Sequence, residues 1–122
     1  MLRIYLSGDM QSGWQDIVKN ALPQFIYYDP RDKKLDQPQE YTVWDLFHIA
    51  ESNIVFAFMA RDNPSGIGLA VECGYGKALG KLVILVDEKQ DKYFPIVRYT
   101  ADITFDSLDD GIRFLRELRN DI

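Results

Sequence analysis

The chain has 122 residues, of which 47% are hydrophobic, so it is long enough for one core and too short for two stable ones. Its formal net charge is −5 and no run is rich in lysine or arginine, which argues against binding of a nucleic-acid polymer but permits a single nucleoside or nucleotide. The single cysteine, Cys73, and the lack of a long apolar run indicate a reducing compartment and no membrane association. We therefore expect a single domain over residues 1–122, located in the cytoplasm.

The first half of the chain alternates strand and helix patterns. Residues 2–6 predict a strand that ends in a turn containing Gly8, and residues 11–22 predict a helix that ends at Pro23. A short strand over residues 24–28 and a polar loop over residues 29–39 follow. Because proline interrupts helices, Pro38 is expected to delay the next helix until Glu40, and this helix should run to about Asn53.

The second half contains two continuous apolar runs, residues 54–59 and 82–86, which are typical of strands buried on both faces of a parallel sheet. Between them lies a turn followed by a helix that Gly80 should end, which makes a βαβ unit. Residues 87–99 predict a long surface loop, residues 101–105 a last strand, and residues 108–118 a helix capped by Ser107. The whole pattern predicts an α/β fold: a doubly wound, flavodoxin- or Rossmann-like, five-stranded parallel sheet with helices on both faces.

Glu72 is the only charged residue between Asp62 and Lys77, and its neighbours are apolar. The positive end of the helix dipole favours its ionised form, whereas burial favours its neutral form. A carboxylate in such a balance suits a nucleophile or an acid-base group. The structural alternative is a helix glutamate that caps a backbone amide or pairs with a distant arginine.

Ligands of doubly wound sheets bind at the carboxyl ends of the strands, near the topological switch point. Asp45 is the best acidic partner for Glu72 at this edge, although its own position, taken alone, favours a first-turn aspartate that only interacts with the helix dipole. Tyr5 could offer its hydroxyl to the site or could be a packed aromatic. His48, the only histidine, could carry protons, but a structural role is favoured. No ligand spacing indicates a metal, and no motif indicates a cofactor.

These residues carry a family resemblance. The runs Ile4–Gly8, Asn53–Ala57 and Gly66–Gly76, together with Asp45, resemble the nucleoside 2-deoxyribosyltransferase family and its nucleoside 5′-monophosphate N-glycosidase relatives, over about residues 2–105. The specific part is Glu72 followed by Cys-Gly-Tyr-Gly. The resemblance implies that Glu72 attacks the sugar to form a glycosyl-enzyme ester, that Asp45 helps proton movement to the departing base, and that Tyr5 lines the site.

The chain differs from this family at positions that, in the family, contact the 5′ end of the sugar. Gly66 stands six residues before Glu72, where the transferases have an aspartate and the monophosphate glycosidases a serine. Asp9 replaces a basic phosphate loop, which favours nucleosides over nucleotides. The candidate substrate contacts are Gly8, Asp9, Asp62, Ser65, Gly66, Gly68 and Asp102.

Asp102 lies near the position at which the transferases receive an asparagine from a neighbouring subunit, so the resemblance implies a homodimer or a larger homo-oligomer. Two alternatives to a nucleoside enzyme stay open. One is a nucleoside 5′-monophosphate N-glycosidase, and the other is a non-catalytic module that binds a nucleotide-derived ligand. Within the nucleoside class, the sequence does not choose between base transfer and hydrolysis.

Overall fold

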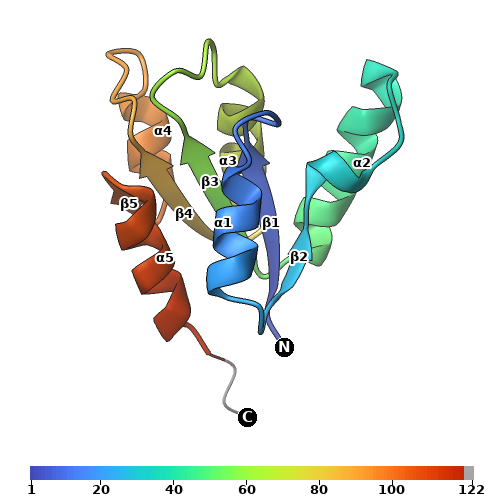
Figure 1. The fold of residues 1–122 in the computed structure, drawn as a ribbon. Helices are drawn as coiled ribbons and strands as arrows, with labels where there is room; N and C mark the ends of the chain where they lie inside the picture. Colours follow the sequence, from blue (N-terminus) through green and yellow to red (C-terminus); the bar gives the residue numbers. More distant parts are fainter. Residues whose placement is uncertain (120–122) are drawn as a thin grey trace.

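A computed structural model describes residues 1–119 of the chain. Five parallel strands form one sheet in the order β2-β1-β3-β4-β5, and helices connect them, so the predicted α/β fold is confirmed (Figure 1). The elements in chain order are β1 (Arg3–Gly8), α1 (Trp14–Ala21), β2 (Ile26–Tyr28), the 3-10 helix η1 (Pro30–Asp32), α2 (Pro38–Glu51), β3 (Ile54–Met59), α3 (Ile67–Ala78), β4 (Leu82–Asp87), α4 (Pro95–Thr100), β5 (Ile103–Phe105) and α5 (Leu108–Glu117).

Hydrophobic layers cover both faces of the sheet. Helices α1 and α5 pack on the face seen in front in Figure 1, and α2, α3 and α4 pack on the other face. Because successive side chains of a strand point to opposite faces, Ile4 and Leu6 of β1 belong to the first layer and Tyr5 to the second. Strand β3 is buried along its whole length, which explains its continuous apolar sequence.

Two prolines begin helices where the sequence predicted loop. Helix α2 begins at Pro38 and not at Glu40, and the expected long loop over residues 87–99 contains α4, which begins at Pro95. Proline is well suited to the first helical position because the N–H that it lacks would have no partner there. Asp45 lies beyond the first turn of α2, so the purely dipolar role of a first-turn aspartate does not apply to it.

All five strands end at the same edge of the sheet, at the top of Figure 1. The chain leaves β1 toward β2 on one side and leaves β3 toward β4 on the other, so the topological switch point lies between β1 and β3. Helix α3 follows β3 at this point and ends, as predicted, just before Gly80, which has a φ of 77°. Within residues 1–119, no helix combines the length and the apolar character that crossing a membrane requires.

Candidate active site

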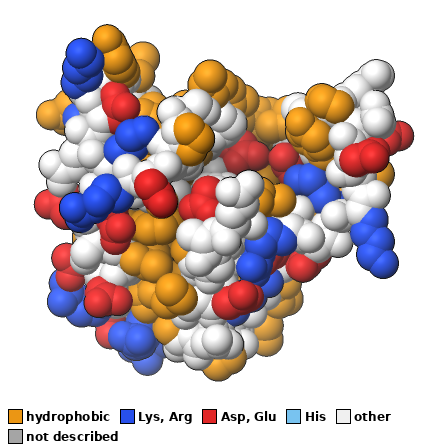
Figure 2. Space-filling model, turned by 45° about the horizontal axis from the view of Figure 1, so that its top comes forward, with side chains coloured by type: hydrophobic (Ala, Val, Ile, Leu, Met, Phe, Trp, Pro, Cys, Tyr) orange, Lys and Arg blue, Asp and Glu red, His pale blue; other side chains and the backbone are white. Residues whose placement is uncertain are grey.

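A cleft of about 460 Å³ opens at the switch point between β1 and β3. Figure 2 looks onto this edge and shows acidic side chains inside the hollow, with lysine or arginine beside them. The end of β1, the first turns of α3, the inner side of α2 and the β2–α2 connection form its walls. The residues that line it are Gly8, Met10, Pro30, Arg31, Lys33, Leu35, Tyr41, Asp45, Gly68, Leu69 and Glu72.

Glu72 is held in place by two hydroxyl groups of β1. The Tyr5 hydroxyl donates to one carboxylate oxygen at 3.0 Å, and the Ser7 hydroxyl donates to the other at 2.6 Å. Tyr5 and Ser7 are two residues apart on the strand, so both point to the face that α3 covers. Within residues 1–119, Glu72 neither caps an amide nor pairs with an arginine, and the hydroxyl groups of Tyr5 and Ser7 orient its carboxylate toward the cleft.

The protonation of Glu72 is finely balanced. Burial and the charge of Asp45 raise the pKa of Glu72, whereas the hydrogen bonds from Ser7 and Tyr5 and the charge of Lys33 lower it, with a net result of about 7. Burial and the nearby charge of Glu72 raise the pKa of Tyr5, so Tyr5 stays a hydrogen-bond donor. Near neutral pH the site thus holds a carboxyl group that is poised between its neutral and ionised forms.

Asp45 lies across the cleft and forms an ion pair with Lys33, whose Nζ is 2.5 Å from Asp45 Oδ1. The Lys33 side chain is only 8% exposed, and its Nζ lies 5.1 Å from the centre of the Trp44 ring and 5.5 Å from that of Tyr41. Lys33 lies in the segment predicted as a polar loop, and no sequence pattern pointed to Tyr41. Tyr41 is recognisable in retrospect, because it is one helical turn before Asp45 and shares its face.

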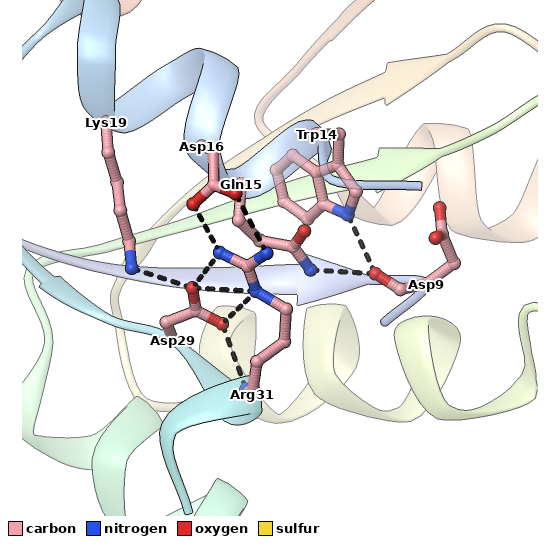
Figure 3. A network of polar contacts seen from close by, with 7 residues as sticks. All are labelled: Asp9, Trp14, Gln15, Asp16, Lys19, Asp29 and Arg31. Atoms are coloured by element: carbon pink, nitrogen blue, oxygen red, sulfur yellow. Dashed lines mark hydrogen bonds and ion pairs between the residues drawn. The ribbon is translucent and has the colours of Figure 1, made fainter. Parts of the chain in front are cut away.

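A buried carboxylate anchors the connection that carries Lys33 (Figure 3). Asp29 pairs with Lys19 and Arg31, each at 2.7 Å, and Arg31 also reaches Asp16 at 2.8 Å. Burial alone would raise the pKa of Asp29, but the hydrogen bonds from Arg31 and Lys19 lower it overall. This network ties β2 and η1 to α1 and so fixes the wall of the cleft that Lys33 belongs to.

The remaining candidate substrate contacts lie outside this cleft. Asp9 and Asp62 line a neighbouring hollow of about 260 Å³, and Ser65 is exposed on the loop before α3. Gly66 has a φ of 72°, a left-handed conformation that favours glycine, and a Cβ placed there would lie 2.7 Å from Cε of Met59.

Two further residues have structural surroundings. Asp102 pairs with Lys77 and accepts the amide of Val83 near the start of β4, at the opposite edge of the sheet. His48 stacks on Trp44 with ring centres 3.8 Å apart, and its Nδ1 lies 2.8 Å from the Trp44 carbonyl oxygen. The structure therefore brings Glu72, Tyr5, Asp45, Gly8 and Gly68 together and leaves Asp102 and His48 apart from them.

No protein-family model and no curated protein matches the chain. Solved structures do match. The 2-deoxyribosyltransferase from Bacillus psychrosaccharolyticus has a TM-score of 0.70 and 21% identity, over 96% of this chain and 92% of that one. The Clostridium botulinum CMP N-glycosidase has a TM-score of 0.65 and 16% identity, over 95% and 99%. The Leishmania mexicana 2-deoxyribosyltransferase has a TM-score of 0.71 and 14% identity, over 98% and 100%. The predicted resemblance is thus confirmed at the level of the fold, since the chain has the fold of the 2-deoxyribosyltransferases and of this N-glycosidase over nearly its whole length.

Proposed function

We propose that this protein cleaves or transfers the N-glycosidic bond of a nucleoside or deoxynucleoside, with Glu72 as the nucleophile. The observation that carries this proposal is the Glu72 carboxylate, which is held by Tyr5 and Ser7 at the wall of the cleft with a pKa of about 7. The shared fold with 2-deoxyribosyltransferases and an N-glycosidase supports the reaction class.

In the proposed reaction a Glu72 oxygen attacks the anomeric carbon of the sugar while the bond to the base breaks. The sugar is then held as an ester, from which water or a second base removes it. Tyr5 and Ser7 keep the carboxylate oriented, and Asp45 lies on the side of the departing base. If water releases the sugar from the ester, the protein is a glycosidase; if a second base takes up the sugar, the protein is a transferase.

The surroundings of Asp9 favour a substrate without a 5′-phosphate. The Asp9 carboxylate already accepts the backbone N–H groups of Gln11 at 2.9 Å and Ser12 at 2.7 Å. These are the groups with which a loop before a helix would hold a phosphate, and the neighbouring Asp62 adds a second negative charge to the hollow. We therefore place nucleosides before nucleoside monophosphates as substrates.

A direct test incubates the protein with a panel of ribonucleosides and 2′-deoxynucleosides, with and without acceptor bases, and follows the free base. We expect base release or exchange by the wild type, and a loss of at least about 10³-fold in Glu72→Ala. Glu51→Gln, which changes an exposed glutamate at the end of α2, is the matched control and should keep full activity. Equal release by the wild type and Glu72→Ala would exclude the proposed nucleophile.

The competing proposal is a non-catalytic module that binds a nucleoside-derived ligand in the same cleft. The observation that favours it is Gly66, which offers no side chain to the sugar. Calorimetry with the same panel separates the two functions, because a binding module would hold a ligand that is recovered intact after long incubation. An enzyme would return free base.

We also propose that the protein is a homodimer or a larger homo-oligomer. Helices α3 and α4 leave apolar side chains exposed, including Val71 at 57%, Ile96 at 76% and Tyr99 at 89%. Asp102 lies far from the cleft of its own chain, so it would reach substrate only in the site of a second copy. Sedimentation at micromolar concentration should show a dimer or larger species, and a monomer alone would contradict the proposal.

A further inference from the structure

The departing base needs a proton, and Asp45 is poorly suited to provide it. A nucleobase that leaves with the bonding electron pair departs as an anion, so an acid that lies beside it lowers the barrier to its departure. Asp45 lies in an ion pair with Lys33, in which its Oδ1 accepts the hydrogen bond. The donor in this pair is Lys33 Nζ, 2.5 Å from Asp45 Oδ1.

We propose that Lys33 is a catalytic residue whose ammonium group donates the proton that the departing base takes up, while Asp45 holds Lys33 in position. This inference rests on the proposed function and names the acid of the same site. The two groups are 2.5 Å apart, both line the cleft with Glu72, and their side chains are only 8% and 16% exposed. The charges of both act on Glu72, which places them within electrostatic reach of the nucleophile.

Lys33 loses one proton in the first step and regains one in the second. As the Glu72 oxygen bonds to the anomeric carbon, the bond from carbon to the base nitrogen breaks and its electron pair stays on the base. The base takes a proton from Lys33 Nζ, which becomes a neutral amine. In the second step water or the incoming base attacks the anomeric carbon and gives a proton to Lys33, and Glu72 is released as a carboxylate.

The other polar groups that line the cleft are less suited to this role. Arg31 donates to Asp29 and Asp16, and these bonds raise the pKa of its guanidinium further, so it does not release protons. Tyr41 is the one hydroxyl group among the residues that line the cleft, and its ring faces Lys33 at 5.5 Å. Tyr41→Phe therefore belongs in the test as the competing donor.

The test uses two substrates with the same sugar. One is a nucleoside that the wild type cleaves, and the other is the 4-nitrophenyl glycoside of that sugar, whose leaving group departs as a stable anion and needs no proton. Lys33→Gln removes the acid, and Lys33→Arg keeps the ion pair with Asp45 but does not release a proton. Lys34→Gln, at the exposed neighbouring lysine, is the matched control.

We expect both Lys33 variants to lower kcat for the nucleoside by about 10²- to 10⁴-fold and kcat for the nitrophenyl glycoside by less than about 10-fold. Lys34→Gln and Tyr41→Phe should leave the ratio of kcat for the nucleoside to kcat for the nitrophenyl glycoside unchanged. The inference is overturned if Lys33→Gln slows both substrates by the same factor, if it leaves the nucleoside rate unchanged, or if Tyr41→Phe shows the selective loss instead. Failure of the proposed function is distinct, because the wild type and Glu72→Ala would then release equal amounts of base.

Discussion

The position of Glu72 should cost the protein stability at neutral pH, so Glu72→Gln should stabilise it while removing the nucleophile. Burial is the largest cause that raises the pKa of Glu72 from 4.5 to about 7. At about 1.36 kcal/mol per pKa unit this corresponds to roughly 3 kcal/mol of unfolding free energy. Because a glutamine must rearrange the hydrogen bonds from Tyr5 and Ser7, we expect a gain of about 1–3 kcal/mol.

The gain in unfolding free energy from Glu72→Gln should increase as the pH rises. Below pH 4.5 the carboxyl group is protonated in both the folded and the unfolded chain, so its replacement should change little. Between pH 4.5 and about 7 the folded chain binds more protons than the unfolded chain, and wild-type stability falls as the pH rises. Above about pH 7 the carboxyl group is ionised in both the folded and the unfolded chain, so the full free-energy cost of its burial is present. The stability advantage of Glu72→Gln should then be constant.

Urea denaturation of the wild type, Glu72→Gln and Glu51→Gln at about pH 4, 6 and 8 tests this expectation. The difference between Glu72→Gln and the wild type should grow from near zero at the lowest pH to its full value at the highest. Glu51→Gln should follow the wild type throughout. A gain that is the same at all three pH values, or a loss at the highest pH, would refute the reasoning about burial.

Three further predictions follow from the same geometry. Base release by the wild type should rise as the pH passes about 7, because Glu72 attacks in its ionised form; a rate that is flat between about pH 5 and 9 would contradict this. Ser7→Ala removes a hydrogen bond that lowers the pKa of Glu72, so the rise in rate should move to higher pH, and an unchanged or lower midpoint would count against it. Gly66→Ser should destabilise the protein by about 1–3 kcal/mol in urea denaturation, because the residue has a φ of 72° and its Cβ would meet Met59; a neutral effect would argue against this strain.

The parts of the fold that the sequence could predict are those with strong local patterns. The apolar runs over residues 54–59 and 82–86 gave the two central strands almost to the residue, and Ser107 marked the start of the last helix. Helix α4 was missed because Pro95 was interpreted as a loop residue. A proline at the first helical position and a proline in a loop have the same local sequence, and only packing of Val97 in the core distinguishes them.

For the candidate site, the sequence pointed to Glu72, Asp45 and Tyr5, and it missed Ser7, Tyr41 and the β2–α2 connection. Glu72 was predicted because an isolated acid in an apolar run is visible in the sequence, and Asp45 and Tyr5 because their helix and strand were expected at the same edge of the sheet. Ser7 could have been found from its two-residue spacing to Tyr5, which places both on one face. Lys33 gave no such signal, because its position depends on contacts far apart in the chain, such as the pairing of Asp29 with Lys19.

Mass spectrometry after rapid acid quenching shows directly whether Glu72 is the nucleophile. The wild type mixed with a nucleoside that it cleaves should gain the mass of one sugar residue, and peptide mapping should place this mass on Glu72. Glu51→Gln should gain the same mass, and Glu72→Gln should gain none. A sugar attached elsewhere, or base release by the wild type with no sugar ester even when the acceptor is withheld, would contradict the account.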